Sequence, residues 1–302
     1  MRDTIIEITD LCKAYGEVKA VDGLSFKVKR GELFAFLGVN GAGKSTTISI
    51  ISGTLQKDSG RVIIDGYDLD LYSDKIKAQV GVVFQNSLLD KQLTVKDNIQ
   101  NRASLYGIFG SQFEERYLEL CKMFDLSEIS NRPLNKLSGG QRRRVDIARA
   151  LVHKPKILIM DEPTTGLDPQ TRKSLWQTID NLRKTTELTV FLTTHYMEEA
   201  VDADYVVILD RGVMVANGTP IQLKNAYTGD FVTLYNITEK QVATLGVNYQ
   251  KINGAYRICL SDTAEAKGLI LSHPEVFNDF EIVKGKMDDV FLAVTGRSLG
   301  EE

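Results

Sequence analysis

Nine residues near the amino terminus read Gly38-Val39-Asn40-Gly41-Ala42-Gly43-Lys44-Ser45-Thr46. They follow the apolar run Leu33–Leu37, which is short enough to be a buried strand, and precede residues 47–51, which continue without a helix breaker. Glycines let the backbone aim its N–H groups at an anion, and a helix beginning near Lys44 adds its positive dipole end. We therefore expect a phosphate-binding loop, with Lys44 on the terminal phosphates and the Ser45 hydroxyl on Mg²⁺.

Length, charge and cysteine content limit the classes of protein to which this chain can belong. The chain has 302 residues, enough for a full core and two domains. Its formal net charge is −3 and the basic run Arg142–Arg144 is short, so we expect no nucleic-acid partner. Three scattered cysteines fit a reducing cytosol and predict no disulfide partner. The amino terminus lacks a signal-peptide pattern, and no apolar run approaches the roughly 18 residues that cross a bilayer. We expect a cytoplasmic protein that reaches a membrane only through another subunit.

Hydrophobic patterns predict an α/β domain over residues 1–225. Short apolar or alternating runs predict strands at 5–8, 24–28, 33–37, 61–66, 80–84, 157–160 and 188–194, and a hairpin at 205–215. From about 94 to 136, apolar residues recur at helical spacing with charges between them, which predicts a helical insertion.

The chain changes character after the turn at Gly218-Thr219-Pro220. Residues 231–235 and 256–260 predict strands, whereas the stretches after them and residues 287–294 predict helices. We therefore expect a separable C-terminal accessory domain of α+β type at residues 226–302. It contains no catalytic constellation.

Polar residues follow several predicted strands, at the edge where parallel sheets bind ligands. Gln85 follows the strand at 80–84, and Asp161 and Glu162 follow the apolar strand at 157–160. Two adjacent carboxylates at a buried strand end are costly unless they serve a cation or a reaction. Asp161 suits a Mg²⁺ shell and Glu162 a general base. His195 ends the strand at 188–194; a lone histidine is more often structural, but from this edge it would reach a γ-phosphate.

Two further features each have two interpretations. Tyr15 lies in a glycine-containing turn, so it is either a core aromatic or an exposed platform for stacking a base. Leu137-Ser138-Gly139-Gly140-Gln141 opens a helix that runs through Leu151. This pentapeptide is either an ordinary helix cap or a second anion-binding helix end.

Together these motifs resemble the nucleotide-binding subunits of ABC transporters over residues 5–224. The resemblance implies a P-loop ATPase domain with a mixed sheet core, an antiparallel β subdomain and the helical insertion. It implies ATP and Mg²⁺ as cofactors. Val39 departs from the family pattern, in which proline is common, but its side chain is not expected to touch nucleotide.

The resemblance also implies a role for each site residue. Tyr15 stacks on adenine, Glu162 is the catalytic carboxylate, and His195 is the γ-phosphate switch. Gln85 contacts Mg²⁺ or the attacking water and relays motion to the membrane subunit. The remaining roles are phosphate binding by Gly38, Asn40, Gly41, Ala42, Gly43, Lys44, Ser45 and Thr46, metal binding by Ser45, Gln85 and (through water) Asp161, and contacts across a head-to-tail dimer by Ser138, Gly140 and Asp168.

Three stretches resemble the daunorubicin-resistance branch of exporters, which use ABC-2 type permeases: residues 137–151, 166–172 and 287–292. This narrower resemblance implies two partners, a polytopic ABC-2 permease and a second ATPase subunit. It places the chain at the cytoplasmic face of the membrane. Related subunits export sodium, polysaccharides, lipids or peptide antibiotics, so the sequence leaves the cargo open.

Two alternative functions compete with export. A non-transport ABC ATPase would act on ribosomes, chromosomes or iron–sulfur assembly. A single P-loop and pentapeptide argue against the tandem translation type, and the lack of long heptad runs argues against the chromosome type. A metabolic P-loop kinase would leave residues 137–141 and His195 unexplained.

Overall fold

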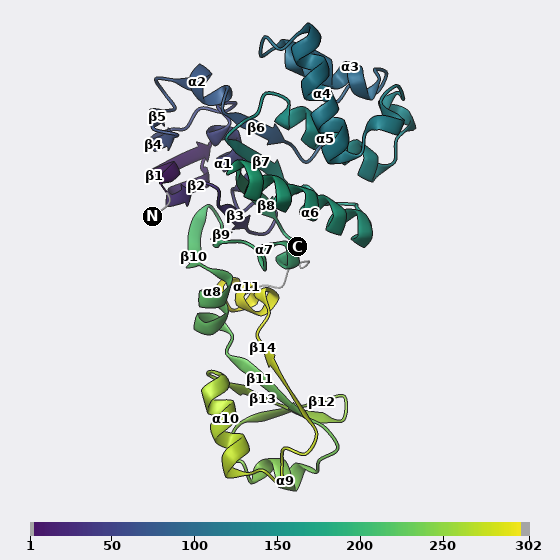
Figure 1. Cartoon of the computed structure of the whole chain (residues 1–302). Helices are drawn as coiled ribbons and strands as arrows, with labels where there is room; N and C mark the ends of the chain where they lie inside the picture. Colours follow the sequence, from purple (N-terminus) through teal and green to yellow (C-terminus); the bar gives the residue numbers. More distant parts are fainter. Residues whose placement is uncertain (1–2, 297–302) are drawn as a thin grey trace.

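The computed structural model describes residues 3–296, and a six-stranded mixed sheet forms the centre of its larger body (Figure 1). β3 pairs in parallel with β8 and β9, and β7 pairs in parallel with β6 and β8, so these strands end at one edge. β10 alone runs antiparallel, beside β9. The strands, in the order β10-β9-β3-β8-β7-β6, span Val213–Gly218, Tyr205–Asp210, Leu33–Leu37, Thr189–Thr194, Ile157–Asp161 and Val80–Val83.

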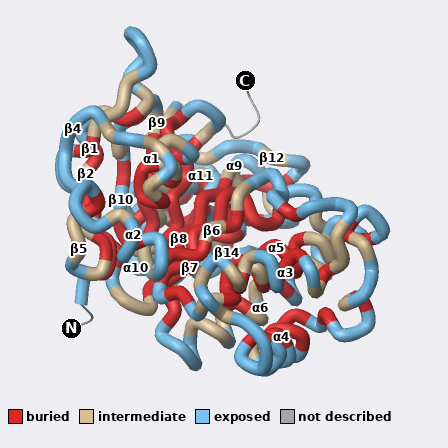
Figure 2. The backbone as a smooth tube through the Cα atoms, turned by 90° about the horizontal axis from the view of Figure 1, so that it is seen from above, coloured by how far each residue is buried: buried red, intermediate tan, exposed pale blue. Residues whose placement is uncertain are grey.

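A second, antiparallel sheet packs on the first through aromatic side chains. Phe26 of this sheet lies 5.1 Å from Phe34, and Phe34 lies 5.1 Å from Phe191, measured between ring centroids. Such clusters bury large apolar areas, and Figure 2 shows buried residues concentrated along the central strands. The strands, in the order β2-β1-β4-β5, span Val18–Lys29, Thr4–Tyr15, Ser59–Ile64 and Tyr67–Asp68.

The segment predicted to be a helical insertion is helical. Thr94 caps its first helix, because its side chain accepts the Asp97 backbone N–H while Asp97 bonds back to Thr94. The next helix of this segment buries Phe113, Tyr117 and Phe124. The elements are α3 (Val95–Ser104), α4 (Gly110–Phe124) and the 3₁₀ turns Ser127–Ile129 and Leu134–Lys136, and they pack beside α5 (Gly139–Leu151).

Other helices lie around the two sheets (Figure 1). α6 is capped by Asp168 and has Pro169 at its first position, which suits a helix start. The helices are α1 (Lys44–Ile51), α2 (Ser73–Lys77), α6 (Pro169–Thr186), α7 (Met197–Ala200) and α8 (Pro220–Tyr227). No helix within residues 3–296 is both long and apolar enough to span a membrane.

Residues 229–285 form a small accessory domain with its own core below the larger body (Figure 1). Its antiparallel sheet has the order β12-β13-β11-β14, and its helices cover one face. The prediction of helices after residues 235 and 260 is right for α9 and α10 but wrong for β12 and β14. These two strands are short and largely solvent-accessible, so they carry little hydrophobic alternation. The elements are β11 (Asp230–Leu234), α9 (Glu239–Ala243), β12 (Tyr249–Ile252), β13 (Ala255–Leu260), α10 (Thr263–Ser272) and β14 (Phe280–Lys284).

The last described helix, α11 (Met287–Thr295), forms as predicted but packs on the larger body. It contacts α7, α8 and β10. Its buried residues Met287, Val290 and Phe291 join the hydrophobic core that contains β9 and the helical subdomain. The sequence-predicted fold class, an α/β domain with mixed and antiparallel sheets, a helical insertion and a small α+β domain, is confirmed. The chain, however, leaves the larger body after α8 and returns to it at α11.

Candidate functional site

The glycine-rich loop connects β3 to α1 and closes around Lys44. The Lys44 Nζ donates hydrogen bonds to the carbonyl oxygens of Gly38 at 2.7 Å and Val39 at 3.1 Å. Gly43 has a φ of 105°, and a Cβ there would lie 2.3 Å from the carbonyl oxygen of Ala20, so only glycine fits. The loop thus holds an ammonium group at a helix amino terminus, an arrangement that binds phosphates.

Lys44 also lies in the field of the β7 carboxylates. Its side chain is buried, and burial lowers the pKa of Lys44, whereas the negative charges of Glu162 and Asp161 oppose that shift. The carboxylates therefore favour the charged ammonium. β3 and β7 both pair in parallel with β8, so their carboxyl ends lie at the same edge of the sheet.

Asp161 ends β7 and is fixed by two hydroxyl groups. Its Oδ2 accepts a hydrogen bond from Ser45 Oγ at 3.3 Å, and its Oδ1 accepts one from Thr193 Oγ1 at 2.5 Å. Asp161 and Ser45, each of which the sequence predicts to serve Mg²⁺, are therefore in direct contact. Carboxylate and hydroxyl oxygens are donors that suit a hard cation such as Mg²⁺, so the residues present fit that ion.

Glu162 follows Asp161 and gathers the residues predicted to be catalytic. It is 7% exposed and has a φ of 46°, a left-handed conformation that non-glycine residues adopt rarely. Its Oε2 accepts a hydrogen bond from Gln85 Nε2 at 2.9 Å, and its Oε1 lies 3.1 Å from His195 Nδ1. Gln85, Glu162 and His195 follow β6, β7 and β8, so the sheet brings together three residues that are far apart in sequence.

Tyr15 ends β1 with its ring at the surface. The residue is 52% exposed, so Tyr15 is not a core aromatic, and its exposure agrees with the interpretation as a stacking platform. Tyr15 pairs with Val18 at the turn into β2, and β2 passes the phosphate loop where Ala20 approaches Gly43. An exposed aromatic ring on the strand pair beside this loop is available for stacking.

Ser138 and Asp168 cap two helices that touch. Ser138 Oγ accepts the backbone N–H of Gln141 at 3.2 Å, so the pentapeptide does form a helix cap. Asp168 accepts the backbone N–H of Thr171 at 2.9 Å and its hydroxyl at 2.6 Å, and these hydrogen bonds hold the pKa of Asp168 below its usual value. A Cβ on Gly140 would lie 2.6 Å from Thr171 Cγ2, so the amino ends of α5 and α6 are in close contact.

These helix starts form a second group of predicted site residues. Ser138, Gly139 and Asp168 are all exposed. Figures 1 and 2 both show α1 on the side of β1 and β2, and α5 on the side of α3 and α4. The structure thus unites Lys44, Ser45 and the strand-end residues in one place, and it gathers Ser138, Gly140 and Asp168 in another.

Comparison with known proteins identifies the family. Residues 21–165 match the family model described as ABC transporter. The daunorubicin resistance ATP-binding protein DrrA3 of Streptomyces coeruleorubidus is 33% identical over 308 aligned positions, which cover 98% of this chain and 97% of that protein. This chain belongs to the ABC transporter family.

Other similarities agree with this ABC assignment. The linearmycin resistance ATP-binding protein LnrL of Bacillus subtilis is 40% identical over 229 residues, covering 76% of this chain and 73% of that protein. A solved dimeric ATP-binding cassette in a post-hydrolysis state, bound to ADP and Pi, is similar with a TM-score of 0.66 and 31% identity, covering 71% of this chain and 98% of that one. The predictions of an ATP-binding, ATP-hydrolysing subunit and of the daunorubicin-resistance branch are confirmed, and the kinase alternative is wrong.

Sequence reasoning missed Arg143 and Thr193 in this ABC site. The basic run at 142–144 suggests solvated charges, yet Arg143 is 8% exposed and bonds to the ends of β6 and β7. A signal existed, since helical spacing puts Arg143 on the same face as the buried Ile147 and Ala150. Thr193 is one of three threonines in β8, and nothing in the sequence relates it to Asp161.

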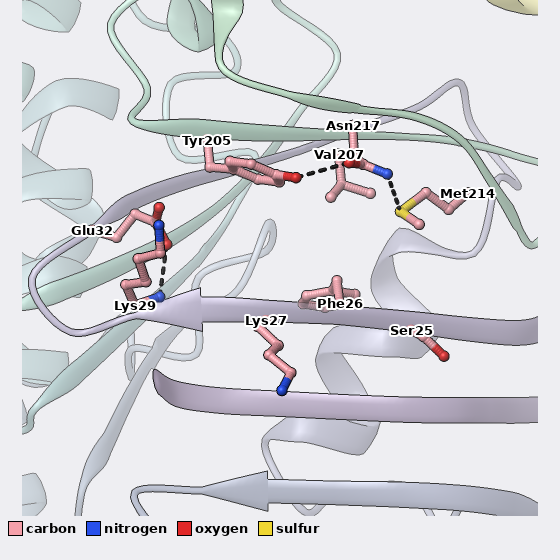
Figure 3. A pocket seen from close by; sticks show the side chains of 9 residues that line it. All are labelled: Ser25, Phe26, Lys27, Lys29, Glu32, Tyr205, Val207, Met214 and Asn217. Carbon is pink, nitrogen blue, oxygen red and sulfur yellow. Dashed lines mark hydrogen bonds between the residues drawn. The ribbon is translucent and has the colours of Figure 1, made fainter. Parts of the chain in front are cut away.

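A separate cavity of 320 Å³ lies between the two sheets of the ABC ATPase body (Figure 3). Tyr205 Oη donates to Asn217 Oδ1 at 2.8 Å on one wall, and the Lys29 backbone N–H donates to Glu32 Oε2 at 2.7 Å on another. Glu32 and Tyr205 stand at the amino ends of β3 and β9, whereas the predicted site lies at the carboxyl ends. None of the predicted site residues lines this cavity.

Proposed function

We propose that this ABC ATPase powers export of a drug, an antibiotic, a lipid or a related compound through a separate ABC-2 type permease. Two observations support export: the relatives with resistance names, and the similarity to DrrA3 along 98% of the chain, accessory domain included. The ATPase lies at the cytoplasmic face of the membrane in this proposal, held there by the permease.

Nucleotide binding uses the phosphate loop and the exposed aromatic ring. Tyr15 stacks on adenine, residues 38–46 donate backbone N–H groups to the phosphates, and Lys44 binds the terminal phosphates. Ser45 and Gln85 would hold Mg²⁺ directly and Asp161 through water. When bound, Mg²⁺ neutralises charge on the phosphates.

Hydrolysis centres on Glu162. The observation that carries this proposal is the meeting of Gln85, Glu162 and His195 beside Asp161. In this proposal Glu162 accepts a proton from the attacking water, Gln85 orients that water, and His195 donates a hydrogen bond to the γ-phosphate. The left-handed φ of Glu162 supports a functional role, because such strain clusters at active sites.

The second group of site residues serves a partner subunit. Ser138 and Gly140 lie at an exposed helix amino end, displaced from the phosphate loop of their own chain. Two subunits packed head to tail would each give this end to the γ-phosphate of the other, with Asp168 linking the two sites. The similar solved cassette is itself dimeric, which supports this arrangement.

The catalytic assignment is tested with Glu162→Gln. This change keeps the shape of the side chain and removes the base, so ATP binding should persist while turnover falls at least about 100-fold. Glu198→Gln, at an exposed carboxylate on α7, is the matched control and should behave as wild type. Normal steady-state hydrolysis by the Glu162 variant would contradict the assignment.

A non-transport ABC ATPase remains the alternative to the export function. Purification from membranes in mild detergent distinguishes the two. Export predicts co-purification with a polytopic membrane protein and ATP hydrolysis stimulated by that protein. A chain that purifies only with ribosomal or other soluble partners would contradict export while leaving the ATPase activity in place.

A further inference from the structure

Arg143 lies in the second turn of α5 and is buried between the segments that carry the site. Its Nε donates to the carbonyl oxygen of Pro163 at 2.6 Å, and its Nη1 donates to that of Phe84 at 2.7 Å. Its Nη2 donates to the carbonyl oxygens of Asp161 at 3.1 Å and Glu162 at 3.0 Å. One planar cation therefore binds the chain at the ends of both β6 and β7, which a lysine could not do.

Asp146 lies one turn further along α5 and contacts the other side of the Gln85 segment. Its carboxylate is 6% exposed and accepts a hydrogen bond from Ser87 Oγ at 3.0 Å. Burial raises the pKa of Asp146, and the Ser87 hydrogen bond and the charge of Arg143 oppose that shift. Arg143 and Asp146 thus contact Phe84 and Ser87, which stand on either side of Gln85.

These two buried charges are poorly explained by stability alone. Burying a charge is costly, and apolar residues of similar volume often replace buried ion pairs without loss of stability. The partners of Arg143 and Asp146 are concentrated at the strand ends that carry Gln85 and Glu162. The same helix begins at the exposed Ser138, the end assigned above to a partner subunit.

We propose that Arg143 and Asp146 are positioning residues that fix Gln85 and Glu162 relative to α5. Closure of a partner subunit on the amino end of α5 then sets the orientation of the catalytic carboxylate. Gln85 and Glu162 already contact each other at 2.9 Å, so a movement of α5 carries both side chains together. This inference rests on the proposed function, since it needs Glu162 as the catalytic group.

The test uses the full-length chain with Arg143→Gln, and Arg144→Gln is the matched control. Arg144 contacts Phe124 and Asp125 in the helical subdomain, so its variant should hydrolyse ATP as wild type does. In Arg143→Gln, kcat per nucleotide-binding subunit should fall roughly 100-fold, the loss expected when a catalytic group is displaced by about 1 Å. KM and the Kd for ATP should stay within about threefold, because the phosphate loop is unchanged.

A double variant separates positioning from a general structural effect. Because Arg143 acts through Glu162, adding Arg143→Gln to Glu162→Gln should cause no further loss of residual turnover. A further loss as large as in the wild-type background overturns the proposal. A normal kcat in the Arg143→Gln chain does so too. If Glu162→Gln itself is fully active, the proposed function fails; if only Arg143→Gln is fully active, this inference alone fails.

Ser87→Ala decides the matter if the Arg143 variant does not fold. Ser87 is exposed, so its replacement leaves the core intact. It removes the hydrogen bond that Ser87 Oγ donates to Asp146 and the longer one, 3.3 Å, that Ser87 Oγ accepts from the Leu89 backbone N–H. We expect kcat to fall about 3- to 10-fold with KM unchanged, in line with the loss of one hydrogen bond of ordinary strength. An unchanged kcat in Ser87→Ala overturns the proposal.

Discussion

The catalytic edge and the accessory domain differ in where their residues come from in the sequence: distant segments form the first, and one continuous segment forms the second. The proposed catalytic residues lie at the carboxyl ends of β3, β6, β7 and β8, which we call the catalytic edge, and side chains from across the sequence converge there on Glu162. The accessory domain is one continuous segment, residues 229–285, with its own core. The sheet therefore brings the proposed catalytic residues together at this edge, whereas residues 229–285 contain none of the predicted site residues.

The join between the two regions shows how they remain distinct. The chain enters the accessory domain at Gly229 and leaves it at Gly285, whose backbone N–H donates to the Gly229 carbonyl oxygen at 3.1 Å. The two points at which the chain passes between the ATPase body and the accessory domain thus lie side by side. Beyond them α11 returns to the core of the ATPase body, so the accessory domain is an insertion between α8 and α11.

The largest expected effect is at the catalytic edge. Lys44→Ala removes a buried cation from the phosphate loop, so the affinity for ATP should fall more than about 100-fold, while the fold persists. Titration of a fluorescent ATP analogue measures this change. Lys122→Ala, on the exposed face of α4, is the control and should bind as wild type does. Unchanged affinity in Lys44→Ala would show that Lys44 does not bind ATP. The functional contrast between the catalytic edge and the accessory domain would then lose its support.

The next effect concerns the exposed start of α5, where we propose that a partner subunit binds. A Cβ on Gly139 meets no atom within 4 Å, so Gly139→Asp should leave the free subunit folded. A carboxylate placed against the γ-phosphate of a partner should block closure, so we expect hydrolysis to fall about 100-fold with ATP binding nearly intact. Sedimentation of the Glu162→Gln chain with and without ATP measures closure directly.

Gly139→Asn provides the uncharged control of the same size. If charge repulsion is the cause, this variant should retain more activity than Gly139→Asp. Normal hydrolysis by Gly139→Asp would show that no composite site forms.

The catalytic edge was predictable because a simple rule governs it. Parallel strands end at one edge of a sheet, so apolar runs followed by Gln85, Asp161, Glu162 and His195 had to meet there. Arg143 was not predictable with the same rule, since its carbonyl partners carry no sequence signature. The left-handed φ of Glu162 is likewise a property of the turn after β7 that the residue type does not reveal.

The chain after α8, which comprises the accessory domain and α11, was less predictable, for two physical reasons. Tyr249–Ile252 and Phe280–Lys284 are short edge strands with few buried positions, so their alternation is weak. Residues 287–295 have a clear apolar helical face, which predicts the helix but not its partner. The location of α11 depends on the apolar surface left by α7, α8 and β10, which only the folded body presents.

A third prediction separates α11 from the accessory domain. Phe291 is fully buried in the ATPase core, so Phe291→Ala should lower the free energy of unfolding by about 3–5 kcal/mol. Leu292, which is 48% exposed, provides the control, and Leu292→Ala should cost less than about 1 kcal/mol. Denaturant titration measures both values. Equal effects would show that α11 does not belong to the ATPase core.

A deletion extends this prediction to the whole accessory domain. Joining Gly229 to Gly285 by a short glycine linker removes residues 230–284 and retains α11, so ATP binding and the stability of the body should persist. A chain ending at 225 also loses α11 and should be markedly less stable. If the internal deletion cannot bind ATP, the division of labour between the two regions is wrong.

The smallest expected effect distinguishes a structural histidine from the one at the catalytic edge. His153 stacks on Tyr106 with ring centroids 3.8 Å apart, where α5 meets α3. Burial and then the positive charge of Arg102 lower the pKa of His153 to about 4. The ordinary value is 6.5, so between pH 6.5 and 4 the unfolded chain binds a proton that the folded chain does not. The stabilising contribution is therefore complete above pH 6.5 and is lost as the pH falls toward 4, by at most about 3 kcal/mol.

The variant His153→Gln tests this pH dependence. It should flatten the dependence of the free energy of unfolding on pH between 6.5 and 4. Its kcat at pH 7.5 should stay unchanged, because His153 is remote from Glu162. An unaltered profile in that variant would assign the acid sensitivity to carboxylates instead, and a loss of kcat would place His153 in the chemistry after all.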